Sequence, residues 1–212
     1  FDTVLVENVS VTSTARYSGG VLFNLRNGSS MTNATVRNVT VTATEEVGGI
    51  AGAVGGSGTS TLSNSVVENF TGVASGEKAG GLVGTLNIKL IVSDCIVKDS
   101  SVTAKRYLGG IAYTLYNGST ATRVGVINTE ITATDTSSSN EQRIGGLFGV
   151  LDGTAVTLQY SYIIDSTIKA TAGTRIGGAI GTSITNNHTV RYNYVANTSV
   201  SPRNAYSGSF LG

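Results

Sequence analysis

A Gly-Gly-apolar-apolar motif recurs seven times along the 212 residues, and this repetition limits the possible folds more than any other feature. The complete copies begin at positions 19, 48, 80, 109, 145 and 177, and a degraded copy, GSFLG, begins at position 208. A period of about 31 residues, with short β-branched segments between Gly- and Asn-rich turns, is typical of a parallel β-solenoid. We therefore expect a single all-β domain over residues 1–212, a β-helix of about seven turns with several short strands per turn.

A second motif follows each complete glycine pair by about twenty residues and places one Asn or Asp in every turn. This column contains Asn8, Asn38, Asn69, Asp99, Asn128, Asp165 and Asn197. Two positions earlier an aliphatic residue recurs: Val6, Val36, Val67, Val97, Val126, Ile163 and Val195. We expect the aliphatic column to fill the core. We also expect the Asn/Asp column to face inward at a corner, where stacked amides bond to one another.

The glycine-pair segment carries apolar residues at two consecutive positions in every turn. In a straight strand consecutive side chains point to opposite faces, so one of the two columns is expected to be exposed. The candidate interface residues are Leu22, Ala51, Val83, Ala112, Phe148, Ile180 and Leu211. A continuous apolar stripe of this kind marks a contact with a neighbouring subunit or with another part of a longer chain. The alternative is that the strand bends at glycine and buries both columns.

The composition restricts the chemistry that the chain supports. A single Cys and a single His disfavour a multi-ligand metal site and any His-based catalysis. The net charge of +1 disfavours a nucleic-acid-binding surface, and no apolar stretch is long enough to span a membrane. Cys95 falls in a column of small residues, which indicates a buried packing role. We predict no cofactor and no enzymatic activity.

An enzyme acting on polysaccharide is the third possibility, because such chemistry needs carboxylates gathered on one outer face. The acidic residues here are scattered along the chain. Asp94 and Arg123 share a column on adjacent turns, and Tyr160 and Tyr192 follow in it. That column predicts either a small polar and aromatic groove or simple pairing at the surface. Loss of activity in Asp94→Ala would be the sign of an enzyme.

Threonine recurs on the outward side of the strand that follows the Asn/Asp column. The candidate ligand-binding face comprises Thr12, Thr42, Thr103 and Thr132. Flat threonine arrays on solenoids resemble ice-binding surfaces, although threonine is also simply a favourable residue in exposed strands. This face gives the alternative function, a solenoid that binds ice or glycan.

Asn-x-Ser/Thr sequons are numerous, and half of them belong to the Asn/Asp column that we expect to face inward. The remaining candidates for N-glycosylation are Asn27, Asn33, Asn117 and Asn187. They would be modified only if a eukaryotic secretory pathway makes the protein.

The units GGIAG, GGLVG, GGLFG and GGAIG resemble the GLUG motif, a short repeat of secreted and surface proteins. Three copies depart from it, because GGVLF and GGIAY end in an aromatic residue and GSFLG lacks the second glycine. The resemblance implies an extracellular or cell-surface location and a non-enzymatic role. Our leading hypothesis is a structural or adhesive solenoid, either a stalk or a filament protomer that associates through its open ends and apolar stripe. It would contact its own copies, the rest of a longer chain, or a glycan-bearing surface.

Overall fold

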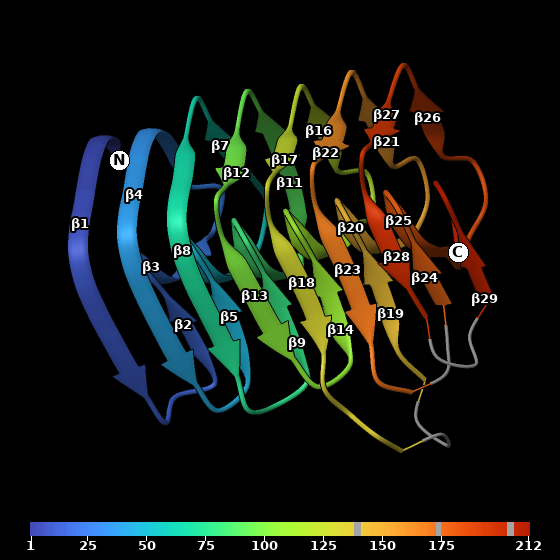
Figure 1. The fold of residues 1–212 in the computed structure, drawn as a ribbon. Helices are drawn as coiled ribbons and strands as arrows, with labels where there is room; N and C mark the ends of the chain where they lie inside the picture. The colour runs from blue at the N-terminus through green and yellow to red at the C-terminus, as the bar shows by residue number, and fades with distance from the viewer. Residues whose placement is uncertain (138–140, 173–174, 203–205) are drawn as a thin grey trace.

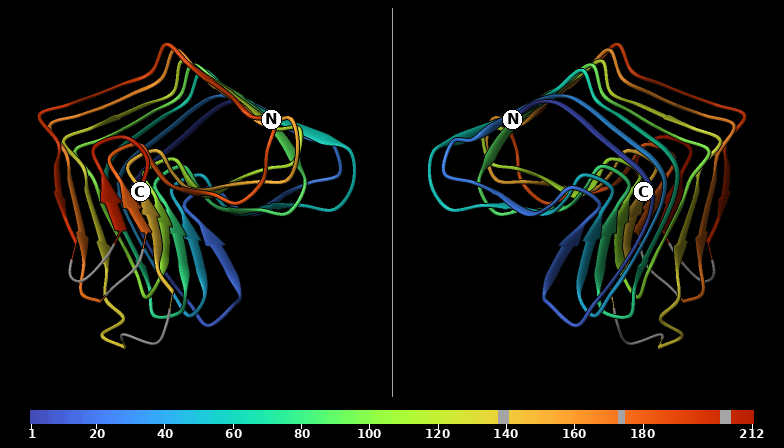
Figure 2. Two further views of the ribbon diagram at one scale, coloured as in Figure 1. Left: turned by 90° about the vertical axis from the view of Figure 1, so that its right-hand side faces the viewer. Right: turned by 90° about the vertical axis from the view of Figure 1, so that its left-hand side faces the viewer.

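The computed structural model describes residues 1–137, 141–172, 175–202 and 206–212, which form a parallel β-solenoid of about six turns (Figures 1 and 2). Every strand pairing among these residues is parallel and joins one turn to the next. The predicted all-β solenoid fold is confirmed. Seven copies of the motif make only about six turns. The last copy is incomplete, because after its glycine it adds only one isolated bridge, Ile180–Leu211, to the preceding turn.

Three sheets run along the solenoid axis. Sheet A consists of β1 (Asp2–Ser13), β4 (Ser30–Ala43), β7 (Thr59–Ser63), β8 (Val66–Ala74), β11 (Lys89–Ser93), β12 (Ile96–Lys98), β13 (Ser101–Ala104), β16 (Thr120–Thr122), β17 (Gly125–Ile127), β18 (Glu130–Ala133), β21 (Thr157–Gln159), β22 (Tyr162–Ile164), β23 (Thr167–Ala170), β26 (Thr189–Arg191), β27 (Tyr194–Ala196) and β28 (Ser199–Ser201). Sheet B consists of β2 (Tyr17–Gly19), β5 (Glu46–Gly48), β9 (Lys78–Gly80), β14 (Tyr107–Gly109), β19 (Arg143–Gly145), β24 (Arg175–Gly177) and β29 (Tyr206–Gly208). Sheet C consists of β3 (Leu22–Arg26), β6 (Ala51–Gly55), β10 (Val83–Leu86), β15 (Ala112–Tyr116), β20 (Phe148–Asp152) and β25 (Ile180–Ser183).

Equivalent positions of successive repeats pair directly, so the columns inferred from the repeat are physical stacks. Val6 pairs with Val36, Val36 with Val67, and Val67 with Val97. Val36, Val67 and Val97 are fully buried, as their aliphatic character predicts. Stacked strands lie about 4.8 Å apart, so identical side chains pack against one another along the axis.

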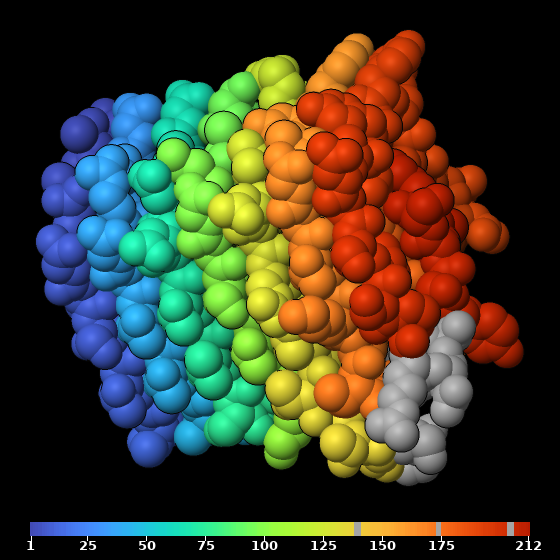
Figure 3. All heavy atoms as spheres, viewed as in Figure 1, coloured from blue at the N-terminus to red at the C-terminus, as the bar shows by residue number. Residues whose placement is uncertain are grey.

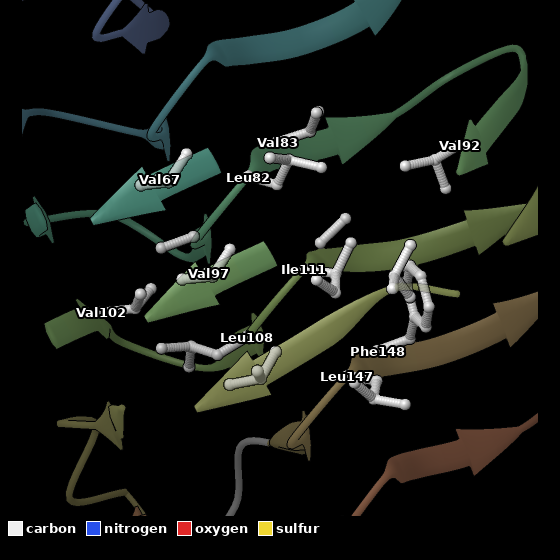
Figure 4. Close-up of a cluster of buried hydrophobic side chains, with 14 of the residues drawn as sticks. Val67, Leu82, Val83, Val92, Val97, Val102, Leu108, Ile111, Leu147 and Phe148 are labelled. Atoms are coloured by element: carbon white, nitrogen blue, oxygen red, sulfur yellow. The ribbon is translucent and has the colours of Figure 1, made fainter. Parts of the chain in front are cut away.

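The expected exposed apolar stripe is wrong, because both apolar columns lie in the core. Ala51, Val83, Ala112, Phe148 and Ile180 are at most 2% exposed, and so are Leu82 and Leu147 of the preceding column. Only the terminal members differ, since Leu22 is half-buried and Leu211 is exposed. Figure 4 shows Leu82, Val83, Leu147 and Phe148 together in the buried cluster.

The reason for this burial is a sharp bend at the glycine pair. Strand β9 ends at Gly80 and β10 begins at Val83, so the chain changes from sheet B to sheet C at Gly81 and Leu82. Neither glycine leaves room for a side chain. A Cβ atom on Gly81 would lie 2.7 Å from Val97 Cγ1, and one on Gly80 would lie 2.8 Å from the Cα atom of Ala112. Because the chain bends here, consecutive side chains do not alternate between core and solvent.

The Asn/Asp column also differs from expectation, because its members are exposed at a corner of sheet A. Their φ angles lie between 44° and 57°, in the left-handed region that Asn and Asp tolerate better than most residues. The side chains do stack as predicted: Asn38 Nδ2 donates to Asn8 Oδ1 at 3.0 Å, and Asn69 Nδ2 donates to Asn38 Oδ1 at 2.7 Å. Backbone conformation, and not burial, therefore selects Asn and Asp at this corner.

In the turns from Asp99 onward the residue after the corner is Ser or Thr, and its hydroxyl donates to the carbonyl oxygen two residues earlier. Ser100 Oγ donates to the carbonyl oxygen of Lys98 at 2.6 Å and accepts from the N–H of Phe70 at 3.1 Å. Ser166 is bonded in the same way to Ile164 and Thr129. These buried hydroxyls pair with backbone groups that, because of the corner, make no hydrogen bond between strands.

Candidate binding surfaces

The most regular surface of the molecule is one face of sheet A, which we call the hydroxyl face. It is built by the second half of β1, β4 and β8 and by β13, β18, β23 and β28, and Figures 1 and 3 look onto it. Its two outward columns are in register across every turn. The first column is Ser10, Thr40, Thr71, Ser101, Glu130, Thr167 and Ser199, and the second is Thr12, Thr42, Val73, Thr103, Thr132, Lys169 and Ser201.

The predicted ligand-face residues all lie in the second column. Thr12 and Thr42 are exposed, and Thr103 and Thr132 are half-buried by their neighbours. Successive strands repeat these hydroxyls about every 4.8 Å, and the two columns are about 7 Å apart along each strand. The result is a near-rectangular lattice of small polar side chains on a rigid sheet.

Val73 is the aliphatic member of this lattice. The repeat predicts an inward aliphatic residue three positions after the corner residue, as at Val41 and Val102, and a one-residue bulge after Asn69 would bring Val73 to that inward place. Instead Val73 pairs with Thr42 and Thr103, and Gly72 takes the inward place. A Cβ on Gly72 would lie 2.7 Å from the ring of Phe70, so that ring fills the space of the missing side chain. Phe70 stands where the preceding turn has Val39, and this larger side chain is the feature of the sequence that could have indicated the exchange.

Among the described residues of the two columns, charge interrupts the lattice at one ion pair towards the C-terminal end. Lys169 Nζ lies 3.0 Å from Glu130 Oε1. The hydrogen bonds from Lys169 and Thr132 lower the pKa of Glu130, so this carboxylate stays ionised. A shallow hollow of about 440 Å³ lies beside the first column, between Thr71, Ser101 and the corner residues Asp99 and Asn128. This hollow extends the polar surface around the corner.

The second corner of sheet A carries the Asp94, Arg123, Tyr160 and Tyr192 column. Arg123 makes a two-pronged ion pair with Asp94 at 2.6 and 2.8 Å, which lowers the pKa of Asp94. The rings of Tyr160 and Tyr192 stack with centroids 5.0 Å apart. These four residues occupy left-handed corner positions and pair with the next turn. They form surface pairs, which was one of the two predicted outcomes.

The candidate sequon residues all reach the surface. Asn27, Asn33, Asn117 and Asn187 are exposed. Asn8, Asn38, Asn69 and Asn197, which the inward assignment of their column excluded, are exposed too. Two of the four candidates also hold a turn, because Asn27 Oδ1 accepts from the N–H of Ser57 and Asn117 Oδ1 accepts from the N–H of Thr154. Glycosylation at these positions stays a prediction.

Residues with catalytic potential are placed as follows. Cys95 is fully buried, and burial raises the pKa of its thiol to about 12. Desolvation lowers the pKa of His188, whose Nε2 contacts Thr185 Oγ1 at 3.1 Å. Within the described ranges, no three His, Cys, Asp or Glu side chains gather as a metal site would require. The same ranges hold no helix long and apolar enough to cross a membrane.

Carboxylates on the surface chiefly join neighbouring turns. Arg37 binds Glu7 at 2.8 Å and Glu68 at 3.2 Å, and Lys98 binds Glu68 at 2.9 Å. The four residues form a ladder across four successive turns with alternating charge. Each exposed pair of this kind contributes under about 1 kcal/mol, so the ladder mainly favours the native register of the turns.

Comparison of the chain with protein-family models, with curated proteins and with solved structures yields no match. The resemblance to the GLUG repeat therefore rests on the motif, and function has to be argued from the surfaces.

Proposed function

We propose that the chain is a non-enzymatic, extracellular structural and adhesive solenoid that contacts a repetitive partner through its hydroxyl face. The observation that carries this proposal is the in-register alignment of two hydroxyl-rich columns over all the turns of sheet A. A partner with its own regular spacing, such as the surface of an insoluble polysaccharide, can meet many of these hydroxyls at once.

The physical advantage of such a face is preorganisation. Threonine has few side-chain rotamers in a strand, and each strand is fixed by its neighbours, so little conformational entropy is lost on contact. Single hydroxyl contacts are weak, but contacts that repeat along one rigid body act together. A solenoid therefore gains adhesion from the length of the array instead of from one deep site.

Two further features support an extracellular structural role. The acidic residues of the charge ladder and of the corners are engaged with neighbouring turns, which favours a scaffold over a polysaccharide-cleaving enzyme. The exposed sequons and the resemblance to a repeat of secreted and surface proteins favour a location outside the cell. The apolar stripe is buried and takes no part in this proposal.

The test is a sedimentation assay with crystalline cellulose, chitin and insoluble β-1,3-glucan. The wild-type chain is expected to sediment with at least one of these solids. The double variant Thr42→Lys/Thr103→Lys places two long cations in the second column and should lower the bound fraction at least tenfold. The matched control is Thr35→Lys/Thr122→Lys, which alters two outward, half-buried threonines elsewhere on sheet A and should bind like wild type.

Two results would contradict the proposal. If the wild-type protein stays in solution with all three solids, the proposed adhesion to polysaccharide surfaces is wrong. Equal sedimentation of both double variants would show that adhesion does not use the hydroxyl face. Circular dichroism of each variant excludes unfolding as the cause of a loss.

Ice binding is the second candidate function, because the same lattice repeats hydroxyl and methyl groups of threonine at nearly constant intervals. It is favoured by the N-terminal turns, where Thr12, Thr40 and Thr42 lie together without a charged neighbour in either column. Thermal hysteresis measured on the wild type and on Thr42→Lys/Thr103→Lys tests this function. A wild-type value of zero would eliminate it.

A further inference from the structure

A small pocket lies where sheets B and C meet, away from the hydroxyl face. Its volume is about 230 Å³, and Lys78, Asn87, Tyr113, Tyr116 and Asp152 contribute to its lining. Sheets B and C diverge from the glycine bend and enclose a V-shaped angle on the side of the molecule remote from β13, β18 and β23 (Figure 2). The pocket is therefore independent of the surface on which the proposed adhesion depends.

The pocket contains a residue at which one repeat departs from the motif. Among the six complete copies the fifth position is glycine in four, at Gly52, Gly84, Gly149 and Gly181, and aromatic in two, at Phe23 and Tyr113. A Cβ atom on Gly149 would lie 2.6 Å from the carbonyl oxygen of Leu108, so at this position sheet C packs closely against sheet B. Tyr113 occupies the same place in its own turn, and its ring extends along the surface of sheet B.

Contacts hold the Tyr113 ring in a fixed position. Its centroid lies 5.1 Å from that of Tyr107, and Lys78 Nζ lies 5.8 Å from it. Burial raises the pKa of Tyr113 despite the nearby Arg143, so the phenol stays neutral. A second ring, Tyr116, lines the same pocket. The pocket thus presents two aromatic side chains whose ordering has already been achieved by packing.

Several polar side chains of the pocket make no hydrogen bond or ion pair to the described residues, whereas Lys78 is paired with Glu46. Asp152 is the only one of the 13 acidic residues that makes no ion pair or hydrogen bond within the described part of the chain. The side chains of Asn87 and Thr85 make no hydrogen bond to the described residues either. Asp152 is half-buried, and a carboxylate offers two oxygens that accept hydrogen bonds. Partly desolvated acceptors and donors of this kind gain most from a ligand that pairs with them.

We propose that this pocket binds one neutral pyranose unit of a glycan. Asp152 accepts hydrogen bonds from adjacent sugar hydroxyls, Lys78 and Asn87 donate to ring or hydroxyl oxygens, and the tyrosine rings cover the C–H face of the sugar. A small hollow, open to solvent and lined by two tyrosine rings and a few convergent polar groups, suits a ligand of this size and amphipathic character. The unpaired carboxylate disfavours uronic acids, because two carboxylates would be brought together.

Saturation-transfer NMR and titration calorimetry with soluble tetrasaccharides test this proposal on the intact chain. The probes are the tetramers of β-1,4-glucose, β-1,4-xylose, β-1,4-mannose and N-acetylglucosamine, with tetragalacturonate as the acidic comparison. We expect binding of at least one neutral tetramer and at least tenfold weaker binding of tetragalacturonate. Asp152→Asn and Tyr113→Gly should each weaken the neutral ligand at least tenfold.

Matched controls separate the pocket from general effects. Asp165→Asn makes the same chemical change at an exposed corner, and Tyr160→Gly removes a ring at a left-handed position that glycine tolerates. Both should bind like wild type. Tyr113→Gly restores the residue found in four other turns, so its thermal unfolding should stay close to that of wild type.

The possible outcomes are unambiguous. Binding that is lost in Asp152→Asn and Tyr113→Gly and kept in the controls supports the pocket. The absence of a signal with every neutral tetramer overturns it, and so does unchanged binding in folded Asp152→Asn. Neither result affects the sedimentation assay, because the hydroxyl face is unaltered in these variants.

Discussion

The hydroxyl face and the tyrosine pocket lie on different sides of the same turns and are built in opposite ways. Every turn contributes equivalent residues to the hydroxyl face, and their pairing keeps them in register. The pocket depends on residues found once, since Tyr113 replaces a repeated glycine and Asp152 is the acidic side chain left unpaired in the described structure. In this solenoid, repetition builds an extended surface and the scaffold under it, whereas a departure from repetition builds a local site.

This contrast predicts that changes in repeated columns alter stability and that changes in unique pocket residues alter binding. The largest effect on stability is expected at the second glycine of a pair. A Cβ on Gly110 would lie 2.8 Å from Val126 Cγ2 and would also meet the backbone of Gly146. Gly110→Ala should lower the free energy of unfolding by about 3 kcal/mol or more, and the melting temperature by roughly 6–12 °C.

Thermal unfolding followed by circular dichroism measures this effect. Gly55→Ala is the control, because a Cβ there meets only the side-chain amide of Asn24, at 3.2 Å. If the two variants melt at the same temperature, the close approach of backbones at the glycine pair does not hold the turns together.

A smaller effect is expected at the corner hydroxyls. Ser100→Ala removes the donor to Lys98 and leaves the buried N–H of Phe70 without its acceptor. The expected loss is about 1–3 kcal/mol, measured by urea denaturation. Ser101→Ala, one residue later on the half-buried outward side, should change stability by less than about 0.5 kcal/mol. Equal values for the two serines would contradict the role assigned to the inward hydroxyl.

The smallest effect concerns the carboxyl of Glu46 in strand β5, on the face of sheet B that also carries Lys78. Glu46 is buried, with Oε1 3.4 Å from Lys78 Nζ, and its Oε2 atom has no hydrogen-bond partner within the described residues. Burial raises its pKa despite the attraction of Lys78. The carboxyl therefore contributes most to stability below its usual pKa, and this contribution is lost as pH rises through the raised folded-state value.

Glu46→Gln should consequently increase the free energy of unfolding at neutral pH and make no difference in acid. A tenfold difference in proton affinity corresponds to about 1.4 kcal/mol, which sets the scale. Melting temperatures measured from pH 3 to pH 8 check this dependence. The exposed Glu45, paired with Arg16, provides the control Glu45→Gln, which should show little change. Destabilisation of Glu46→Gln at pH 7 would mean that the ion pair outweighs the cost of burial.

Part of the architecture could be read from the repeat itself. The parallel solenoid, the buried valines around Val36 and Val67, the charge ladder from Glu7 to Lys98 and the outward threonines all follow from period and residue type. These features depend on pairing between equivalent positions, which a repeated sequence specifies directly.

The candidate sites were less predictable, because they depend on how the chain bends. A strand that alternates inside and outside was expected at Leu82 and Val83, and the bend at Gly81 buries both. The pocket was missed as well. The aromatic ending of GGIAY is a departure from the motif, but nothing in the spacing placed Tyr113 of sheet C beside Lys78 of sheet B.

The sequence by itself determined that identical positions of successive turns would stack, because parallel pairing of repeats keeps every column in register. Tertiary structure alone decided whether the columns at the corners and at the glycine bends face solvent, and which residues from different sheets meet. The physical reason lies in the corners. The left-handed residues and the glycine bends set the direction of each sheet, and these directions expose the Asn/Asp column, bury the apolar stripe and bring Lys78 of sheet B next to Tyr113 of sheet C.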